Sequence, residues 1–334
     1  MSVSQDIIAR MFDPRVSPST MPKLEPFDYA DAVVESTIDE QAALVALLRE
    51  RPGGMSWTQL AGMALEYRSA RVARAHLVVD GLFTDEEHAV RLEQARSDLH
   101  DWAADGLDFL SILDDRYPAR VRDIQEAPPF LFAHGTLWPD DSAVSVVGSR
   151  QASERGVEMA VSISQSLVSM KVSVVAGLAA GIDTAAHLAA LDAGGRTVAV
   201  IGTGIRKSYP ATNSDLQERI THEGLVLSQF WPDAPPQSQN FPMRNAVMSG
   251  YGLATVVVEA GERSGARIQA RLAVSHGRPV ILTDMVINGT EWGRAMVGRP
   301  DVFVASSLGE VTDVVHRLIE RPRQLDTALS QIAV

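Results

Sequence analysis

Glycines and cationic side chains follow several short apolar segments of this sequence, and together they could bind a phosphate group. Gly148, Ser149 and Arg150 come directly after the apolar run 143–147, and a helix is expected to begin near Ser153. Glycine lets a backbone approach a ligand closely, the first turn of a helix offers free N–H groups, and arginine adds a forked cation. This segment therefore predicts an anion-binding site.

Similar residues follow the next apolar segments along the chain. The other candidates for this site are Gly177, Gly181, Gly202, Gly204, Arg206, Lys207, Tyr209, Arg244, Asn245, Ser264 and Gly265. Each is weak evidence by itself, because a glycine after a strand is most often only a tight turn, and Arg206 and Lys207 could be solvated cations. We expect all of them at one edge of a sheet, where cations around backbone N–H groups favour phosphate and the Tyr209 ring suits a base.

Three titratable side chains could face the same pocket, although each also has a structural explanation. Asp183 and His187 are one helical turn apart, which suits an acid–base pair, but an Asp in the first turn of a helix is favoured by the helix dipole alone. Glu259 at a strand end could face a ligand or cap a helix. Both interpretations stay open for these residues, and no catalytic residue is assigned.

Short β-branched runs alternate with helical segments between residues 142 and 310, which is typical of an α/β protein. The predicted strands are 143–147, 172–176, 197–201, 225–228, 255–259, 279–282 and 302–304. They are apolar at nearly every position, so we expect a parallel sheet that is buried on both faces. The predicted fold class is a doubly wound, mostly parallel α/β sheet of Rossmann-like type, which binds ligands outside the carboxyl ends of its strands.

The remainder of the chain is expected to form smaller units around this sheet. Helical patterns recur before residue 105, and the run Ser56-Trp-Thr-Gln59 is a capping box that opens one of them. The expected parts are an extended N-terminal arm over 1–35, a small helical domain of the SAM or helix-hairpin kind over 36–105, the Rossmann-like domain over 106–320 with a bridging strand pair in 106–140 and a last helix from about 307 to 320, and a polar tail over 321–334.

The composition excludes several classes of protein. The chain has 334 residues, a formal net charge of -12 and no cysteine, so disulfide frameworks, thiolate nucleophiles and cysteine zinc sites are excluded. Residues 1–140 hold 13 Lys and Arg but 24 Asp and Glu, so any nucleic-acid contact must come from a local cluster of cations in the nearly neutral back half.

Several motifs are also missing from the sequence. It contains no metal-ligand spacing of histidines, no P-loop of the form G-x-x-x-x-G-K-S/T and no G-x-S-x-G elbow. The N-terminus does not resemble a secretory signal, and the apolar stretch 172–191 contains Asp183 and His187, which makes it a poor membrane span. We therefore expect a cytoplasmic protein without a membrane segment, a metal or a cofactor.

The segments that carry the candidate residues resemble the DNA-processing protein A family, DprA or Smf. The matching runs are Val147-Gly-Ser-Arg150, AGLAAGIDTAAHLAAL, VIGTGIRKSYP, Phe241-Pro-Met-Arg244-Asn245 and VVEAGERSGARIQA, in this order and spacing. The resemblance covers roughly residues 107–283. The sequence departs from the family pattern at Gln229, at Ala246, where the family usually has a cation, and in the segment after Thr283.

The resemblance implies a binding fold rather than an enzyme. Proteins of this family hold single-stranded DNA, form homodimers and help to load a RecA-type recombinase during natural transformation. By the matching motifs, the DNA phosphates would meet Gly148, Ser149, Arg150, Lys207 and Arg244, while the glycines at 177, 181, 202 and 204 would clear space for the strand. We expect the dimer to form through residues 302–304 and the helix after Ser307.

A protein that binds a small nucleotide is the alternative, either as a sensor or as a phosphoribohydrolase of the same Rossmann-like superfamily. Those hydrolases typically show the signature P-G-G-x-G-T-x-x-E, which the segment Glu259-Ala-Gly-Glu-Arg-Ser-Gly265 does not supply. Because no second acid–base partner is evident beside Glu259, we expect binding without hydrolysis of an N-glycosidic bond.

Overall fold

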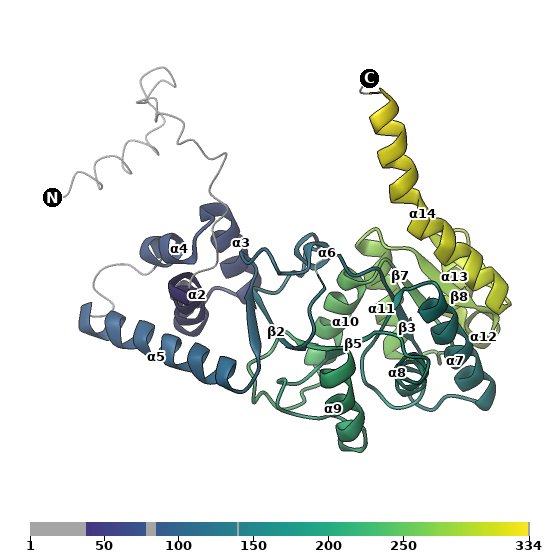
Figure 1. The fold of residues 1–334 in the computed structure, drawn as a ribbon, viewed down its shortest axis with the longest axis horizontal. Helices are drawn as coiled ribbons and strands as arrows, with labels where there is room; N and C mark the ends of the chain where they lie inside the picture. Colours follow the sequence, from purple (N-terminus) through teal and green to yellow (C-terminus); the bar gives the residue numbers. More distant parts are fainter. Residues whose placement is uncertain (1–37, 78–84, 139, 333–334) are drawn as a thin grey trace. The chain divides into compact units, whose positions relative to one another are not determined.

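A nine-stranded sheet forms the centre of the structure, a computed structural model that describes residues 38–77, 85–138 and 140–332 (Figure 1). The strands lie in the order β1-β2-β6-β5-β4-β3-β7-β8-β9. Their bounds are β1 (Asp108–Ser111), β2 (Phe130–Gly135), β3 (Ala143–Val147), β4 (Ser173–Ala176), β5 (Thr197–Ile201), β6 (Leu225–Ser228), β7 (Ala254–Val257), β8 (Val280–Thr283) and β9 (Val302–Ala305). The predicted arm over 1–35 lies outside the described residues.

The strands from β3 to β9 pair with one another in parallel, which confirms the predicted fold class. From β3 the chain moves outward through β4 and β5 to β6, and then returns to β7 on the other side of β3. The strand order therefore reverses between β3 and β7. In doubly wound sheets this switch point is where the loops at the carboxyl ends of the strands separate and leave room for a ligand.

Helices cover both faces of the sheet, because its apolar strands must be buried on both sides. The helices in the parallel part are α7 (Glu154–Ser169), α8 (Ile182–Asp192), α9 (Ser214–Glu223), α10 (Asn240–Tyr251), α11 (Gly265–Ser275), α12 (Asp284–Gly289), α13 (Glu291–Met296) and α14 (Leu308–Ile332). Side chains of α7, α8 and α14 share a buried core with β3 and β4 on one face, and α10 and α11 share a second core on the other (Figure 1).

The bridging strands extend this sheet beyond β6, and the helices that precede them in the chain pack against it. Strand β2 pairs antiparallel with both β1 and β6, so the segment predicted as a bridging strand pair belongs to the same sheet. The helices before it are α2 (Ile38–Glu50), α3 (Trp57–Tyr67), α4 (Ala70–Leu77) and α5 (Asp85–Ala104), and the capping box predicted at Ser56 is present. The separation of 36–105 as its own domain remains a prediction.

Aromatic rings join the helical region to the sheet. Trp102 at the end of α5 packs edge-on against Phe132 with 4.9 Å between ring centroids, and Phe130 stacks on Trp231 at 4.6 Å. These buried contacts belong to one hydrophobic core that also contains residues of α2 and α3. Within the described residues, the helices and the sheet therefore share apolar packing rather than a solvated junction.

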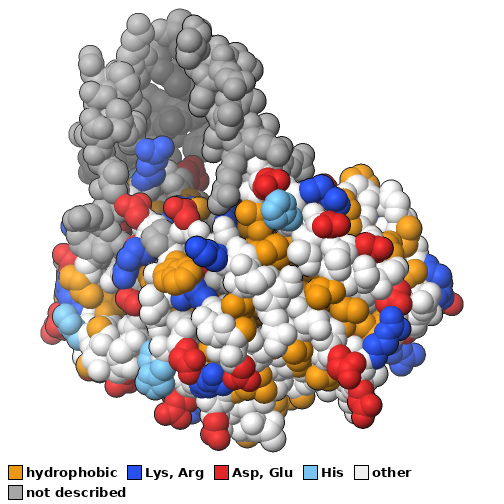
Figure 2. Space-filling view, turned by 45° about the vertical axis from the view of Figure 1, so that its right-hand side comes forward, with side chains coloured by type: hydrophobic (Ala, Val, Ile, Leu, Met, Phe, Trp, Pro, Cys, Tyr) orange, Lys and Arg blue, Asp and Glu red, His pale blue; other side chains and the backbone are white. Residues whose placement is uncertain are grey.

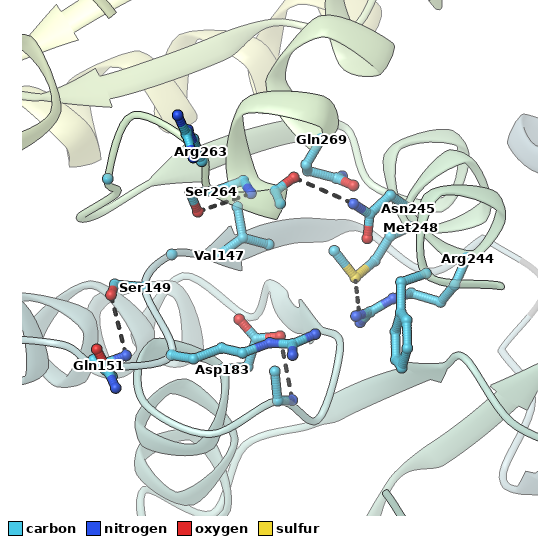
Figure 3. A pocket seen from close by; sticks show the side chains of 17 residues that line it. Val147, Ser149, Gln151, Asp183, Arg244, Asn245, Met248, Arg263, Ser264 and Gln269 are labelled. Carbon is cyan, nitrogen blue, oxygen red and sulfur yellow. Dashed lines mark hydrogen bonds between the residues drawn. The ribbon is translucent and has the colours of Figure 1, made fainter. Parts of the chain in front are cut away.

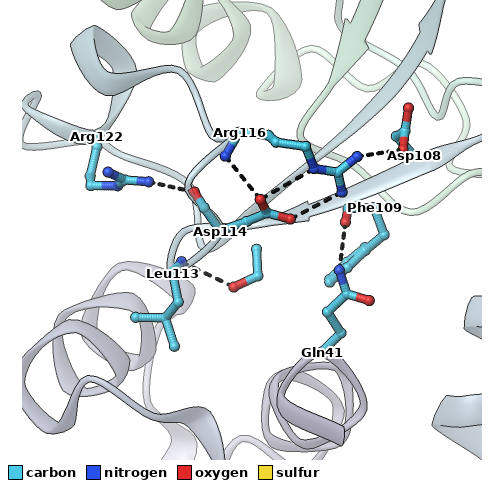
Figure 4. Close-up of polar contacts among 8 residues, drawn as sticks. Gln41, Asp108, Phe109, Leu113, Asp114, Arg116 and Arg122 are labelled. Carbon is cyan, nitrogen blue, oxygen red and sulfur yellow. Dashed lines mark hydrogen bonds and ion pairs between the residues drawn. The ribbon is translucent and has the colours of Figure 1, made fainter. Parts of the chain in front are cut away.

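Polar contacts fix the turn between β1 and α6 (Ala119–Arg122), as Figure 4 shows. The Asp114 carboxylate accepts hydrogen bonds from the Arg116 backbone N–H at 2.9 Å and from its Nη2 at 3.1 Å, and Arg116 also pairs with Asp108 at 3.0 Å. Arg122 donates to the Ile112 carbonyl at 2.9 Å, and Gln41 of α2 donates to the Phe109 carbonyl at 3.1 Å. The bridging segment is thus held by hydrogen bonds within its own turn and by one from α2.

The C-terminal segment differs from the sequence-based expectation. The last helix was expected to end near Glu320 and to be followed by a polar tail over 321–334, but α14 continues to Ile332. Leu, Ala, Gln and Arg, which have high helix propensity, are frequent after residue 322, whereas Pro322 itself disfavours a helix interior. No helix in the described part of the chain is long and apolar enough to cross a membrane.

Candidate nucleic-acid interface

A cavity of about 680 Å³ lies at the carboxyl edge of the sheet, at the switch point between β3 and β7 (Figure 3). Its lining comes from residues 147–151 after β3, from the start of α8, from residues 241–248 of α10 and from residues 261–269 around the start of α11. Cavities of about 300–1,000 Å³ are typical of small-molecule and cofactor sites. The sheet topology and the cavity therefore indicate the same location for a ligand.

The loop after β3 is held in a single conformation by backbone contacts. The Ser149 N–H donates to the Glu259 carbonyl at 2.7 Å, and the Ser149 hydroxyl accepts a hydrogen bond from the Gln151 N–H at 3.1 Å. A Cβ atom at Gly148 would lie 2.6 Å from the Ile182 side chain and 2.7 Å from the Glu259 carbonyl, so only glycine fits there. This packing brings the loop against the first turn of α8.

Arg150 extends from this loop at the rim of the cavity. Its side chain is exposed, and its guanidinium carbon lies 5.4 Å from the centroid of the Phe241 ring, a cation–π distance. Arg150 has no ion-pair partner among the residues that the structure describes. Its charge is therefore available to an anionic ligand.

Arg244 approaches the same cavity from inside the protein. Only 5% of the residue is exposed, and its Nη1 donates to the Val200 carbonyl at 3.1 Å, while its Nε has no partner among the described residues. Burial lowers the pKa of Arg244, and Asp183 opposes this effect. A Cβ atom at Gly177 would lie 1.1 Å from Nη1, so this glycine is needed to accommodate the Arg244 side chain.

The other glycines of the predicted site also make room for the protein itself. Gly181 has a φ of 79° and faces the Ser149 carbonyl, which would lie 2.3 Å from an added Cβ. At Gly202 the added atom would meet the Phe241 ring at 2.9 Å, and at Gly204 it would meet the Trp231 carbonyl at 2.2 Å. Protein atoms therefore pack closely against these glycines and Gly177, and their role in clearing space for a DNA strand stays a prediction.

Asp183 lines the cavity, but its carboxylate is used for structure. It accepts hydrogen bonds from the Gly177 N–H at 2.9 Å and the Ala179 N–H at 3.4 Å, so it fixes the loop that leads into α8. Burial raises its pKa, while the charge of Arg244 and these two hydrogen bonds act in the opposite direction. The side chain thus stabilises the loop below Arg244.

His187 and Glu259 do not line the cavity, so the structure favours the structural interpretation of both. His187 is fully buried with its Nδ1 2.7 Å from the Thr197 hydroxyl, and burial lowers its pKa to about 3. Glu259 accepts hydrogen bonds from the Ser153 N–H at 3.0 Å and the Ser153 hydroxyl at 2.7 Å, at the start of α7. The acid–base pair considered for Asp183 and His187 does not form in the cavity.

The cations after β5 are neutralised by acidic side chains. Arg206 pairs with Asp105 and, at 3.0 Å, with Asp233, and Lys207 lies 3.6 Å from Asp233. Tyr209 is 41% exposed, and its ring centroid lies 5.5 Å from that of Phe241. Tyr209 lines a smaller cavity of about 90 Å³ together with Gly177, Arg150 and Arg244, next to the main one.

The structure thus brings together only part of the predicted site. The predicted residues that line the main cavity are Gly148, Ser149, Arg150, Asp183, Arg244, Asn245, Ser264 and Gly265. The sequence-based prediction missed Arg263, an exposed arginine on the cavity wall that precedes Ser264, as well as Gln151 and Phe241. The signal for Arg263 was present, since it lies within the glycine-rich run after β7 that supplied Ser264 and Gly265.

The charges around the cavity suit a phosphate ligand. Three arginines, Arg150, Arg244 and Arg263, line it together with the single carboxylate of Asp183. Elsewhere the charges are mixed, and Figure 2 shows basic and acidic side chains interspersed over one face of the molecule. Among the described residues, no group of three His, Asp or Glu side chains could hold a metal ion. A local excess of cations is therefore the main electrostatic feature of this site.

The fold and the site together define a Rossmann-like protein with an arginine-lined pocket at the switch point of its sheet. Residues 108–298 match the family described as DNA recombination-mediator protein A, and the chain belongs to this family. The resemblance found in the sequence is confirmed.

Individual relatives agree with this assignment. The chain is 44% identical over 174 residues to the DNA processing protein DprA of Streptococcus pneumoniae, and 33% identical over 227 residues to the protein Smf of Escherichia coli. These matches cover 51% and 64% of this chain, and 60% and 61% of the relatives, so the chain spans about three fifths of their length.

Solved structures support the same fold. The crystal structure of DprA from Streptococcus pneumoniae matches with a TM-score of 0.57 and 29% identity, over 84% of this chain and 94% of that one. A DprA structure from Helicobacter pylori, described for its single-stranded DNA binding mode, matches with a TM-score of 0.55 and 19% identity over 63% of this chain and 96% of that one. At this low identity the second match supports the fold alone.

Proposed function

We propose that this chain binds single-stranded DNA at the cavity beside the carboxyl ends of β3 and β7, and that it acts as a recombination mediator in DNA processing. The observation that carries the proposal is the convergence of Arg150, Arg244 and Arg263 on one cavity at the switch point. Arginine binds phosphate through parallel N–H donors, and the exposed Arg150 and Arg263 form no ion pair with a carboxylate among the described residues. Membership of the recombination-mediator family supports the same ligand.

The surroundings of the cavity favour a single strand over a duplex. Tyr209 and Phe241 present rings beside Arg150, and unpaired bases can stack on aromatic side chains whereas paired bases cannot. Arginines and backbone N–H groups contact phosphates rather than base edges, so we expect little sequence preference. The relative from Helicobacter pylori is described as binding single-stranded DNA, which is consistent with this proposal.

Titration of the purified protein with labelled single-stranded DNA, in the presence of duplex or AMP competitors, tests this function. Arg150→Ala should weaken binding about tenfold or more, because a charge-assisted hydrogen bond contributes about 1.5–3 kcal/mol. Arg271→Ala is the matched control, since Arg271 is an exposed arginine of α11 outside the cavity lining. A folded Arg150→Ala protein with unchanged affinity would remove the proposed site.

The partners of this activity are also part of the proposal. We infer a RecA-type recombinase as partner during natural transformation in the cytoplasm, and the description of the family as a DNA recombination mediator is consistent with such a partner. Strand β9 pairs only with β8, which leaves one edge of β9 free among the described residues, and Val304 is 42% exposed there. An exposed edge strand can pair with a second copy of itself. We therefore propose a homodimer that forms through β9. Light scattering that gives a monomer mass at micromolar concentrations would contradict this homodimer.

We expect binding without catalysis. The alternative, a nucleotide hydrolase, requires a carboxylate that activates water or stabilises the developing cation. Glu259 already receives hydrogen bonds at the start of α7, and Asp183 receives two backbone N–H groups. Incubation with AMP or IMP should release no free base. Turnover that Glu259→Gln eliminates would favour the hydrolase instead.

A further inference from the structure

The loop between β7 and α11 is anchored to α13, which lies behind it. The Glu262 carboxylate accepts a hydrogen bond from the Glu291 N–H at 2.9 Å, at the first residue of α13. The Trp292 indole donates to the Gly261 carbonyl at 3.3 Å, and Trp292 is 5% exposed. Two residues of α13 therefore hold Gly261 and Glu262, which directly precede Arg263, and this loop depends on a helix that does not line the cavity.

Arg263 is the residue that this loop presents to the cavity. Its side chain is exposed and has no ion-pair partner among the described residues, although Glu262 next to it pairs with Arg267 at 3.8 Å. The following residue, Ser264, caps α11 by accepting a hydrogen bond from the Ala266 N–H at 3.2 Å. In Figure 3, Arg263 and Ser264 lie on one wall of the cavity, and Ser149 and Asp183 lie on the opposite wall.

The charge of the cavity exceeds what one phosphate neutralises. With Asp183 ionised, Arg150, Arg244 and Arg263 leave two net positive charges on the lining, whereas one phosphodiester carries a single negative charge. Arg244 is buried, and its Nη1 already donates a hydrogen bond to the Val200 carbonyl. Arg150 and Arg263, which are exposed on separate walls, are therefore the side chains that can contact separate phosphates.

We propose that Arg263 binds a second phosphate of the same strand, and that Glu291 and Trp292 of α13 are positioning residues that hold its loop. This inference rests on the proposed function of the cavity. It assigns Arg150 and Arg263 to two phosphates, and it gives α13 an effect on DNA affinity without any contact with the DNA.

The salt dependence of binding tests the role of Arg263. Arg263→Ala should weaken binding to single-stranded DNA about tenfold and reduce the slope of log affinity against log salt by about 0.7, the value for one phosphate contact on a single strand. Arg271→Ala should change neither quantity, because it removes an exposed arginine of α11 that does not line the cavity. An unchanged slope in a folded Arg263→Ala protein would overturn the proposal.

A double-mutant cycle tests the positioning role of Trp292. Trp292→Phe removes the indole N–H and keeps most of the apolar packing, so we expect weaker DNA binding when Arg263 is present and no further loss in the Arg263→Ala background. Equal losses in both backgrounds would show a merely structural effect and overturn the positioning role. Unfolding curves for each variant establish that the compared proteins are folded.

The outcomes for this inference and for the proposed function are distinct. If the unsubstituted protein does not bind single-stranded DNA, the proposed function fails. If it binds, and Arg150→Ala weakens binding while Arg263→Ala does not, the cavity is a DNA site but the second phosphate contact is wrong.

Discussion

The two edges of the central sheet use charged residues in opposite ways. At the amino edge, Asp141 is 4% exposed, and its carboxylate accepts hydrogen bonds from Ser173 at 2.5 Å, Arg196 at 3.0 Å and Tyr251 at 2.8 Å. Burial raises the pKa of Tyr251, and Asp141 raises it further, so the phenol stays a hydrogen-bond donor. Ser173 begins β4, Arg196 directly precedes β5, and Tyr251 ends α10 shortly before β7, so the network lies at the amino ends of these strands.

At the carboxyl edge, the arginines that line the main cavity lack such ion-pair partners among the described residues. Arg150 and Arg263 have no ion pair among the described residues, and the Nε of the buried Arg244 has no hydrogen-bond acceptor there. The backbone around these arginines is nonetheless closely packed, because Gly148 and Gly177 admit no Cβ. The comparison shows that charged side chains at the amino edge hold the strands together, whereas arginines without an ion pair line a closely packed cavity at the carboxyl edge.

Removal of Asp141 should have the largest effect on the amino edge. Asp141→Ala leaves the buried guanidinium of Arg196 without its partner, and the loss of one member of a buried ion pair costs about 3–5 kcal/mol of unfolding free energy. Chemical denaturation measures this change, with Asp140→Ala as the control, since Asp140 is an exposed neighbour. An equal, small effect of both substitutions would contradict the structural role of the network.

Gly177→Ala should disturb the carboxyl edge through Arg244. The new Cβ would occupy the place of Nη1, so the guanidinium must move away from the Val200 carbonyl. We expect a stability loss of about 1–3 kcal/mol from overpacking, together with weaker binding of single-stranded DNA. Gly62→Ala is the control, because an added Cβ at this position in α3 meets no atom within 4 Å. Unchanged DNA affinity in Gly177→Ala would show that the position of the Arg244 guanidinium does not matter for DNA binding.

His187 should make the stability of the buried interior depend on pH. It is neutral in the folded protein down to about pH 3, whereas in the unfolded chain it takes up a proton below its ordinary pKa of 6.5. Its contribution is therefore fully present above pH 6.5 and is lost as the pH falls, by about 2 kcal/mol at pH 5.

Denaturation of His187→Asn at pH 7 and pH 5 measures this contribution. The variant should show a smaller loss of stability between the two pH values than the unsubstituted protein. His100→Asn, which removes an exposed histidine of α5, should leave the pH dependence unchanged. The same pH dependence in all three proteins would contradict the effect of burial on His187.

Lys207→Ala should have the smallest effect. Lys207 was expected to contact phosphate, but it lies 3.6 Å from Asp233, which also pairs with Arg206. Since an exposed ion pair contributes about 0–1 kcal/mol, we expect little change in stability and a loss of DNA affinity well below that of Arg150→Ala. A loss of affinity as large as that of Arg150→Ala would show that Lys207 leaves Asp233 when DNA binds. The loop after β5 would then contribute to DNA binding as much as the loop after β3.

The strands and the location of the site could be predicted because they depend on local patterns. Each predicted strand from 143–147 to 302–304 agrees with the structure to within two residues at either end, since β-branched apolar runs between turn residues select buried strands. The edge of the sheet that holds the site followed from the parallel topology, which places all the loops after the strands on one side. The extension of α14 beyond Glu320 was missed, because Pro322 disfavours a helix interior.

The sequence by itself determined the fold class, the family and the glycine-rich loops of the pocket. Only the tertiary structure decided which charges are paired. Arg206 is neutralised by Asp105, about a hundred positions away, and Glu259 caps a helix that begins at residue 154. Arg150 and Arg263 form no ion pair among the described residues. The physical reason is the distance along the sequence over which each kind of interaction acts. Strand and helix preferences depend on residues a few positions apart, but the partner of a charge and the space beside a glycine are set by atoms that only folding brings together.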